Sequence, residues 1–353
     1  MKTWLVTGGA GFIGSCFVRM LLESRQVFIV NLDKLTYAGH VENIPQPNAD
    51  HYRFVHGSIE DRQLVAKLLS HHQPARVINF AAESHVDRSI DGPSDFVQTN
   101  VVGTVDLLQQ TFEFYRQLDG PERQQFRFLH VSTDEVYGSL GAEGSFAENS
   151  QYQPNSPYAA SKASSDMFVR AFRETYGLPT LLTNCSNNYG PHQFPEKLIP
   201  LMILNALEQK PLPVYGDGAN IRDWLFVEDH CRAILRVLES GQVGETYNIG
   251  GNAERANLQI VESICEIVDA LLDRTAAQSS RKLIHFVQDR PGHDRRYAID
   301  ATKIRTQLGW TPQVSFEEGL RRTIAWYLDN HEWVSTVSGR GYERERLGVN
   351  ASK

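Results

Sequence analysis

The sequence predicts an α/β protein in which a doubly wound parallel sheet of the Rossmann type is joined to a smaller C-terminal α/β domain. Short β-branched runs alternate with amphipathic helical patterns through the first half of the chain. The runs are apolar at nearly every residue, as in strands that helices cover on both faces. The 353 residues also suffice for two domains of roughly 150 residues each.

The predicted elements follow in order along the chain. Strands are expected at residues 3–6, 27–32, 52–55, 76–80, 126–131 and 180–182, and helices at residues 13–23, 61–69, 94–115 and 158–176. Further strands at residues 224–227 and 246–249 are candidates to return to the first sheet. Residues 258–272 and 315–330 are predicted helices, and the second opens with a capping box from Ser315 to Glu318.

The regular alternation of predicted strands and helices stops near residue 187, which predicts the domain boundary. Gly and Pro cluster at residues 189–191, 210–214 and 215–219, which indicates loops. We therefore assign residues 1–186 and 224–250 to the first domain, and residues 187–223 and 251–353 to the second. The polar residues from 335 onward have the composition of a tail.

Composition excludes several classes of function. Lys and Arg number 35 against 42 Asp and Glu, a net charge of −7 without long blocks, which makes binding to nucleic acid or anionic lipid unfavourable. No apolar run approaches the ~18 residues of a membrane span, and no signal segment precedes the first strand. The four cysteines lie far apart, which argues against disulfides and a metal site. A cytoplasmic protein is expected.

A glycine-rich turn follows the first predicted strand. Gly9, Gly11 and Gly14 match G-x-G-x-x-G, and Gly8 widens the pattern to G-x-x-G-x-x-G. Such glycines let the backbone approach a pyrophosphate at a helix N-terminus, although any tight strand-to-helix turn would also use them. Asp33 ends the second predicted strand, 19 residues after Gly14. A carboxylate there accepts hydrogen bonds from the adenosine ribose and repels a 2′-phosphate, which predicts NAD rather than NADP.

Tyr158 and Lys162 are spaced to share one helix face. A lysine and a nicotinamide ring near a tyrosine lower the pKa of the phenol, so that it can act as a base near neutral pH. The pair alone occurs in many helices as solvated residues. Together with the glycine turn and Asp33, it resembles the short-chain dehydrogenase/reductase superfamily, and the chain length resembles the extended branch that acts on nucleotide sugars.

Asp134 and Glu135 follow the fifth predicted strand, at the sheet edge where open α/β proteins bind ligands. A reducing enzyme needs only a hydroxyl there, so two adjacent carboxylates indicate additional acid–base chemistry. A solvated turn would explain an isolated Asp-Glu pair equally well.

Seven segments resemble the dTDP-glucose 4,6-dehydratase family, and the resemblance covers nearly the whole chain. They are residues 33–39, 81–89, 132–138, 184–191, 194–200, 220–224 and 289–296. Tyr342 and residues 345–348 resemble the end of the family's chains, so the tail is expected to be more ordered than its composition indicates.

The resemblance implies a reaction that converts dTDP-glucose to dTDP-4-keto-6-deoxyglucose and water. Tyr158, supported by Lys162, would take the C4 hydroxyl proton while NAD accepts the C4 hydride, and Thr133 would hydrogen-bond the same oxygen. Glu135 would remove the acidified C5 proton, and a protonated Asp134 would donate to the departing C6 hydroxyl. Hydride return to C6 would regenerate NAD on the protein.

The resemblance also assigns binding residues. Those implied for the cofactor are Gly8, Gly11, Phe12, Ile13, Gly14, Asp33, Lys34, Leu35, Thr36, Ser58, Ile59, Phe80, Ala81, Ala82, Ser84, Thr99, Tyr158, Lys162 and Asn188. Those implied for the substrate are Ser84, Thr133, Asn187, Glu196, Lys197, Leu198, Pro213, Val214, Tyr215, Arg222, Asn257, Arg290, His293 and Asp294. Arg222 and Arg290 suit a diphosphate, because guanidinium groups bind phosphate oxygens bidentately. Ser58 departs from the aspartate usual in the family, which puts some cofactor affinity in doubt.

Other functions compete with this interpretation. A nucleotide-sugar 4-epimerase would share Tyr158 and Lys162 but would not need Asp134 and Glu135, and a non-catalytic NAD-binding protein would need none of the catalytic set. A UDP-glucose 4,6-dehydratase stays open, because the two nucleotides differ by one methyl group and the 2′-hydroxyl.

The family resemblance further implies a homodimer, formed through the helices predicted at residues 94–115 and 158–176. Apolar residues on the first helix are compatible with such an interface and equally compatible with packing on the sheet: Phe96, Val101, Leu108 and Phe112.

Overall fold

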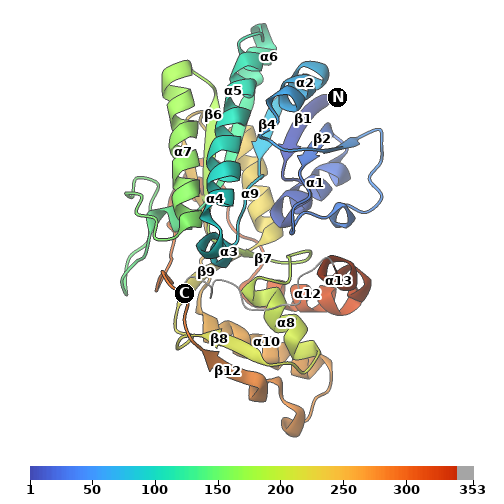
Figure 1. Ribbon diagram of the computed structural model, residues 1–353, viewed down its shortest axis with the longest axis vertical. Helices are drawn as coiled ribbons and strands as arrows, with labels where there is room; N and C mark the ends of the chain where they lie inside the picture. Colours follow the sequence, from blue (N-terminus) through green and yellow to red (C-terminus); the bar gives the residue numbers. More distant parts are fainter. Residues whose placement is uncertain (340–353) are drawn as a thin grey trace.

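A seven-stranded parallel sheet forms the upper half of the molecule (Figure 1). The computed structural model describes residues 1–339, so the prediction for Tyr342 and residues 345–348 lies outside the described residues. The strands are β1 (Lys2–Thr7), β2 (Val27–Asp33), β3 (Tyr52–His56), β4 (Arg76–Asn79), β5 (Arg127–Thr133), β6 (Thr180–Cys185) and β10 (Thr246–Ile249). The strands lie side by side in the order β10-β6-β5-β4-β1-β2-β3. Successive strands are added on one side of β1 as far as β3 and on its other side from β4 onward, and doubly wound sheets bind ligands at the point between β1 and β4 where this switch occurs.

Helices cover both faces of this sheet, which confirms the predicted fold class. α2 (Arg62–His72), α5 (Thr104–Tyr115) and α7 (Pro157–Tyr176) pack on one face, where they bury residues such as Leu69, Leu108 and Phe172. α1 (Phe12–Ser24), α9 (Val227–Ser240) and α11 (Thr302–Leu308) pack on the other face, around Phe17 and Ile234. Most residues of the inner strands are therefore buried, as the continuous apolar runs require, whereas no residue of the edge strand β3 is fully buried.

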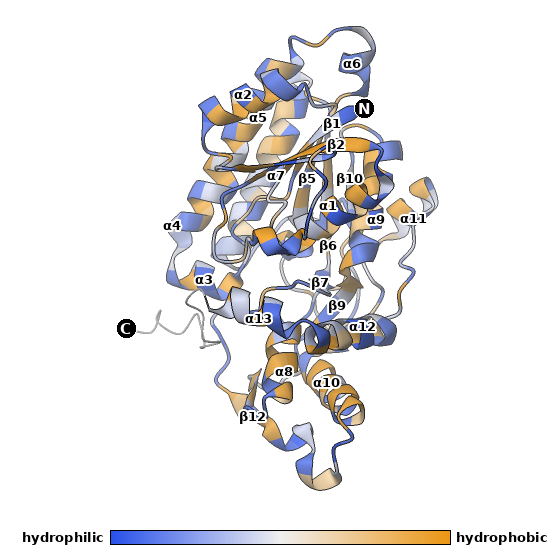
Figure 2. Cartoon of the chain, turned by 90° about the vertical axis from the view of Figure 1, so that its right-hand side faces the viewer, coloured by the Kyte–Doolittle hydropathy of each residue, from blue (hydrophilic) through white to orange (hydrophobic). Residues whose placement is uncertain are grey.

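A second hydrophobic core lies below the sheet. It is built by α8 (Leu198–Leu207), α10 (Asn257–Leu271), α12 (Phe316–Asp329) and α13 (His331–Ser338), whose apolar residues gather between these elements (Figure 2). β7 (Asn187–Tyr189), β9 (Ile221–Phe226) and β11 (Glu254–Ala256) form a three-stranded sheet. β8 (Leu212–Tyr215) pairs in parallel with β12 (Ile284–Val287).

The remaining short helices connect these parts. They are η1 (Val41–Asn43), α3 (Val86–Asp91), α4 (Pro93–Phe96), η2 (Val97–Gly103), α6 (Gly120–Gln125), η3 (Asp134–Tyr137), η4 (Ala276–Gln278) and η5 (Ser280–Leu283). The predicted helix over residues 94–115 is thus divided into α4, the π-helical turn η2 and α5.

Two predictions about the second half are wrong. Residues 212–215 are a strand rather than a loop, because they pair with β12. The strand predicted at residues 224–227 is part of β9, which pairs with β7 and β11 instead of returning to the first sheet. Residues 335–338 belong to α13, whose Trp333 and Val337 are buried in the second core, so this part of the chain is more ordered than its polar composition indicates.

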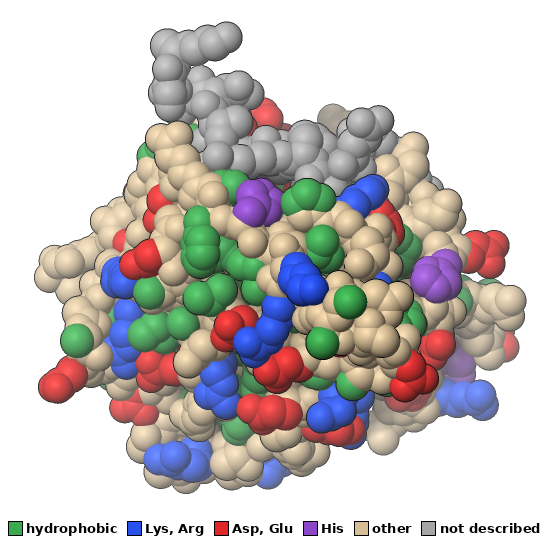
Figure 3. All heavy atoms as spheres, turned by 90° about the horizontal axis from the view of Figure 1, so that it is seen from below, with side chains coloured by type: hydrophobic (Ala, Val, Ile, Leu, Met, Phe, Trp, Pro, Cys, Tyr) green, Lys and Arg blue, Asp and Glu red, His purple; other side chains and the backbone are tan. Residues whose placement is uncertain are grey.

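Local signals set several helix boundaries as expected. Asp61 accepts a hydrogen bond from the backbone N–H of Leu64 and caps α2, and Ser315 accepts from the backbone N–H of Glu318 and caps α12. Acidic and basic side chains are interspersed on the lower face of the molecule (Figure 3). Within residues 1–339, no helix has the length and apolarity needed to cross a membrane.

Candidate active site

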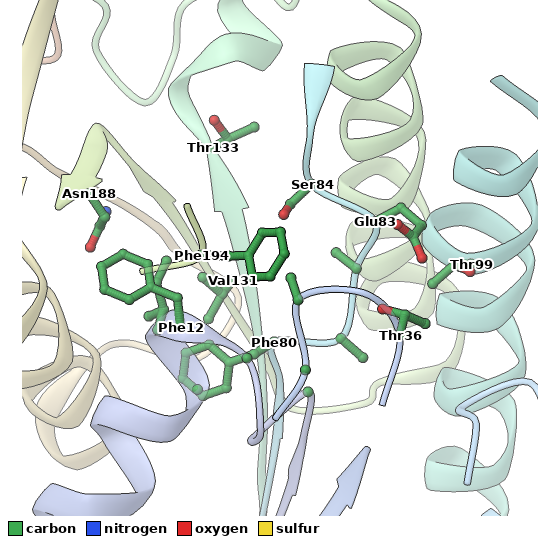
Figure 4. Close-up of a pocket in the computed structure, with 18 of the residues that line it drawn as sticks. Phe12, Thr36, Phe80, Glu83, Ser84, Thr99, Val131, Thr133, Asn188 and Phe194 are labelled. Atoms are coloured by element: carbon green, nitrogen blue, oxygen red, sulfur yellow. The ribbon is translucent and has the colours of Figure 1, made fainter. Parts of the chain in front are cut away.

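A cavity of about 290 Å³ opens at the carboxyl ends of β1, β2, β4 and β5. Phe12 at the start of α1, Phe80 after β4 and Phe194 surround it, and Thr133 at the end of β5 stands at one side (Figure 4). The glycine turn between β1 and α1 contributes Gly8, Gly11 and Gly14 to the lining.

The glycines of this turn are required by close contacts. Gly8 has φ +71°, a conformation that L side chains rarely adopt, and a Cβ there would lie 2.5 Å from the backbone nitrogen of Ala81. A Cβ on Gly14 would lie 2.2 Å from the carbonyl oxygen of Gly8. The N-terminus of α1 therefore approaches the turn closely, in the arrangement that suits a pyrophosphate.

Asp33 lies at the end of β2 and lines the same cavity. Its two carboxylate oxygens accept hydrogen bonds from the backbone N–H groups of Ala10 and Leu35, both at 2.8 Å. Burial raises the pKa of Asp33, while the two backbone hydrogen bonds lower it. A second lone pair on each oxygen is available for the hydroxyl groups of a ribose.

Tyr158 and Lys162 lie on the first turns of α7 and line the cavity from beside β5. Ser156 caps this helix by accepting from the backbone N–H of Ala159, and Pro157 begins it. The Lys162 ammonium is buried and donates to the carbonyl oxygen of Val131 at 2.9 Å. Burial and, after it, the charge of Glu135 raise the pKa of Tyr158 well above its ordinary value. A hydrogen bond with Thr133 opposes this rise.

Asp134 and Glu135 sit side by side in different electrostatic surroundings. Burial, then the charges of Glu135 and Asp223, raise the pKa of Asp134 well above its ordinary value. Burial also raises the pKa of Glu135, but three cations oppose it: Arg290, Arg222 and Lys197. The surroundings therefore favour the neutral form more strongly in Asp134 than in Glu135, which is the direction of separation that an acid–base pair needs.

A second cavity adjoins the first and shares Glu135, Asn187, Glu196 and Lys197 with it. Arg222, Arg290 and His293 line it, and both arginines are largely buried. Arg290 Nη1 contacts Asp87 Oδ1 at 2.6 Å, and Arg222 donates to the carbonyl oxygen of Asp294 at 2.9 Å. Two guanidinium groups are thus held in place next to Glu135.

The structure brings most of the predicted site residues together at these two cavities. Four residues line neither cavity: Leu35, Asp134, Pro213 and Asp294. Leu35 acts through its backbone N–H on Asp33, Asp294 holds Arg222 through its backbone carbonyl, and Asp134 is buried beside Thr133. Sequence reasoning missed Glu83, Gln193 and Phe194 in the first cavity, and Asp87 and Tyr297 in the second. Asp87 belongs to the segment 81–89 and could have been found there.

Comparisons with known proteins agree on one family. The profile described as GDP-mannose 4,6 dehydratase matches residues 5–323. The dTDP-glucose 4,6-dehydratase of Xanthomonas campestris pv. campestris is 58% identical over 351 residues, which cover 99% of each chain. The crystal structure of dTDP-glucose 4,6-dehydratase from Bacillus anthracis in complex with NAD is 47% identical, with a TM-score of 0.84 over 96% of this chain and 100% of that chain.

A solved structure of a different enzyme shows how widely the fold is shared. UDP-glucose 4-epimerase from Thermotoga maritima, determined with UDP-glucose, is 30% identical, with a TM-score of 0.82 over 94% of this chain and 100% of that chain. Fold similarity alone therefore does not separate the two activities. Because the identity to the dehydratases is far higher and spans nearly the full length, the chain belongs to the dTDP-glucose 4,6-dehydratase family.

Proposed function

We propose that this protein is an NAD-dependent lyase that converts dTDP-glucose to dTDP-4-keto-6-deoxyglucose and water. The observation that carries the proposal is the placement of Glu135 between the two cavities, beside Asp134 and facing the cations that would hold a nucleotide diphosphate. The glycine turn and the Asp33 carboxylate fit the pyrophosphate and ribose of NAD. Bound NAD supplies a hydride acceptor for C4 and a donor for C6.

The residues then divide the proton chemistry among them. Tyr158 takes the proton of the C4 hydroxyl, with the Lys162 charge favouring the phenolate and Thr133 orienting the oxygen. Glu135, whose ionised form is favoured by nearby cations against the burial that raises its pKa, removes the C5 proton once C4 is a ketone. Asp134, kept neutral by burial and by the charge of Glu135, donates to the departing C6 hydroxyl.

The observed site disfavours the two alternatives that lack elimination. A 4-epimerase has no step for Asp134 and Glu135, whose surroundings push their protonation states apart. A non-catalytic NAD-binding protein would have no need for Glu135, Tyr158 and Lys162 to converge on one cavity.

We also propose that the first cavity belongs to an NAD-binding domain of residues 1–186 and 224–250, and the second to a nucleotide-sugar-binding domain of residues 187–223 and 251–353. The separate hydrophobic cores support two domains, but α11 packs in the first core and Trp224 and Phe226 pack in the second, so these segments depart from the proposed boundaries. Four buried free thiols support a reducing compartment such as the cytoplasm: Cys16, Cys185, Cys231 and Cys265.

The proposed function is tested by following a deuterium label. Substrate deuterated at C4 is expected to yield product deuterated at C6, because the hydride stays on the bound cofactor between the two steps. Mass spectrometry of the dTDP-sugar product locates the label, and UDP-glucose is assayed in parallel. Loss of the label to solvent would contradict the retained-hydride reaction, no turnover at all would favour a non-catalytic protein, and faster turnover of UDP-glucose would reassign the nucleotide.

A homodimer through η2, α5 and α7 is proposed from their exposed apolar side chains. Phe96 and Leu108, named from sequence, are buried within the chain and cannot form an interface. The exposed residues are instead Val97, Val102, Met167, Phe168 and Tyr176. η2 and α7 pack against each other, and apolar side chains exposed on adjoining helices are typical of an interface.

Phe168→Glu is expected to convert the dimer to a monomer, because it places a charge within this surface. Light scattering coupled to size exclusion measures the mass of each form. Phe286→Glu is the matched control, since Phe286 is 58% exposed on β12, away from these helices, and its substitution should leave the dimer intact. A wild-type protein that is already monomeric would contradict the proposal.

A further inference from the structure

A buried polar cluster surrounds the Lys162 ammonium. We define the Lys162 cluster as His130 and Ser132 on β5, Tyr152 before α7, and Lys162 and Asp166 on α7. His130, Ser132, Lys162 and Asp166 are each less than 5% exposed. His130 Nε2 lies 3.2 Å from Lys162 Nζ and 3.5 Å from Asp166 Oδ1, so the imidazole stands between the two charged groups.

Asp166 is held by specific donors one helical turn after Lys162. Its Oδ2 accepts hydrogen bonds from Ser132 Oγ at 2.8 Å and from Tyr152 OH at 3.1 Å. Its Oδ1 is buried and accepts no hydrogen bond from any described residue. A buried carboxylate with an unpaired oxygen is unfavourable unless a nearby cation stabilises it, and the only cation in this cluster is Lys162.

The charges of this cluster depend on each other. Burial lowers the pKa of Lys162, and the charge that most strongly raises it again is that of Asp166. Burial and the Lys162 charge keep the pKa of His130 well below its ordinary value, so this ring is neutral and does not compete for the role of cation. Asp166 is therefore the group that offsets the cost of a charged lysine in the protein interior.

We propose that Asp166 is a positioning residue for the oxidation step, which as a carboxylate keeps the Lys162 ammonium charged and aligned beside Tyr158. The inference rests on the proposed function, in which Lys162 favours the Tyr158 phenolate. Asp166 itself touches neither cavity and acts only through Lys162.

The proposal makes the oxidation step sensitive to pH near neutrality. Burial raises the pKa of Asp166 to about 7, while Lys162, Ser132 and Tyr152 oppose the rise. Below this pKa the carboxylate is protonated, and the buried Lys162 ammonium loses the charge that raises its pKa. A Lys162 that releases its proton or turns away no longer supports the Tyr158 phenolate. The rate of oxidation is thus expected to fall as the pH decreases through 7.

Four other titratable groups around Asp166 and Lys162 change charge outside this window. Tyr137 on η3 and Tyr152 face Asp166, and Cys185 on β6 lies near Lys162; burial raises the pKa of all three far above neutrality. His130 on β5 has a pKa well below 6.5. Asp134 and Glu135 lie nearer the reacting atoms and have raised pKa values of their own, so the experiment must remove both.

The experiment therefore uses the holoenzyme with Asp134→Asn and Glu135→Gln as the parent. This parent oxidises dTDP-glucose and then stops, and the absorbance of NADH in a single turnover gives the oxidation rate between pH 6 and pH 8. A carboxylate with a pKa near 7 changes the rate about tenfold across this range. Adding Asp166→Asn is expected to flatten the profile at the low rate.

A second variant tests the same idea without removing the carboxylate. Tyr152→Phe removes a hydrogen bond that lowers the pKa of Asp166, so the midpoint of the profile is expected to move to higher pH. Tyr137→Phe is the matched control: its ring packs 5.2 Å from that of Tyr152, and its hydroxyl donates to Asn248 and accepts from Asn184, a donor that it shares with Tyr152, but does not bond Asp166. Its midpoint should stay in place.

A spectroscopic readout reports the protonation of Asp166 independently of activity. Infrared difference spectra of the holoenzyme between pH 6 and pH 8 should contain a carboxylic-acid carbonyl band that is absent from Asp166→Asn. The proposal is overturned if the oxidation rate of Asp166→Asn still changes tenfold between pH 6 and pH 8, or if the midpoint of Tyr152→Phe does not shift. In either case, an active wild type leaves the proposed function intact. If Asp166→Asn does not fold, the Tyr152→Phe midpoint decides.

Discussion

Asp134→Asn is expected to oxidise the substrate and then stall, with loss of water slowed by roughly 10²–10⁴-fold, the usual contribution of a general acid. The amide keeps the shape of the side chain but cannot donate a carboxylic proton. Asp134 is buried, and its Oδ2 has no hydrogen-bond partner among the described residues, so the neutral acid is strongly favoured. Oxidation relies on Tyr158 and should survive, so bound NADH is expected to accumulate in a single turnover.

Glu135→Gln separates the two carboxylates in the same assay. It should also stall after oxidation, but the C5 proton is expected not to exchange with solvent, because no base removes it. In Asp134→Asn the C5 proton should exchange, since Glu135 is intact. Normal turnover of Asp134→Asn without an NADH signal would show that another group, or a water that reaches C6, is the acid. The role of the acid needs this test, because Asp134 lines neither cavity and must still reach the C6 hydroxyl of the substrate.

Gly14→Ala is expected to lower the affinity for NAD by about a hundredfold, the scale of effect of a misplacement of about 1 Å in a binding site. The new methyl group would lie 2.2 Å from the carbonyl oxygen of Gly8 and 2.9 Å from Gly9 Cα, so the turn or the start of α1 must move. Both positions are backbone, which cannot rotate away as a flexible side chain can. Calorimetric titration with NAD measures the loss.

Gly141→Ala is the matched control for this substitution. No atom lies within 4 Å of a Cβ placed at Gly141, and this glycine has no positive φ that would strain an alanine. Its NAD affinity and thermal unfolding should match those of the wild type. If Gly14→Ala binds NAD as tightly as this control, the close approach of α1 to the turn is not what creates the cofactor site.

Local sequence was sufficient for the elements of the first sheet and less so for the second half. Continuous apolar runs such as residues 27–32 are buried on both faces of the inner sheet, so their pattern identifies them. β8 contains Pro213 and lies next to turn residues, and it is a strand only because β12, far along the chain, supplies a partner. The apolar residues of β9 would suit either sheet, and only the tertiary structure determines that β9 pairs with β7 and β11.

The predicted interface residues show the same limit. Helical periodicity places Phe96 and Leu108 on an apolar face but does not say which faces meet the sheet. The structure buries both and exposes Met167 and Phe168 on α7 instead.

By itself, the sequence determined the Rossmann-type fold class, and it predicted the proposed NAD site at Gly8–Gly14 and Asp33 and the proposed catalytic set, because these depend on spacing within one or two adjacent elements. Only the tertiary structure decided how the two carboxylates differ and what supports Lys162. Arg222, Arg290 and Lys197 reach Glu135 from segments distant in sequence, and the neighbours of Asp166 come from β5 and from the segment before α7. Charge and burial depend on which distant groups are brought within a few ångströms, and no local pattern encodes those distances.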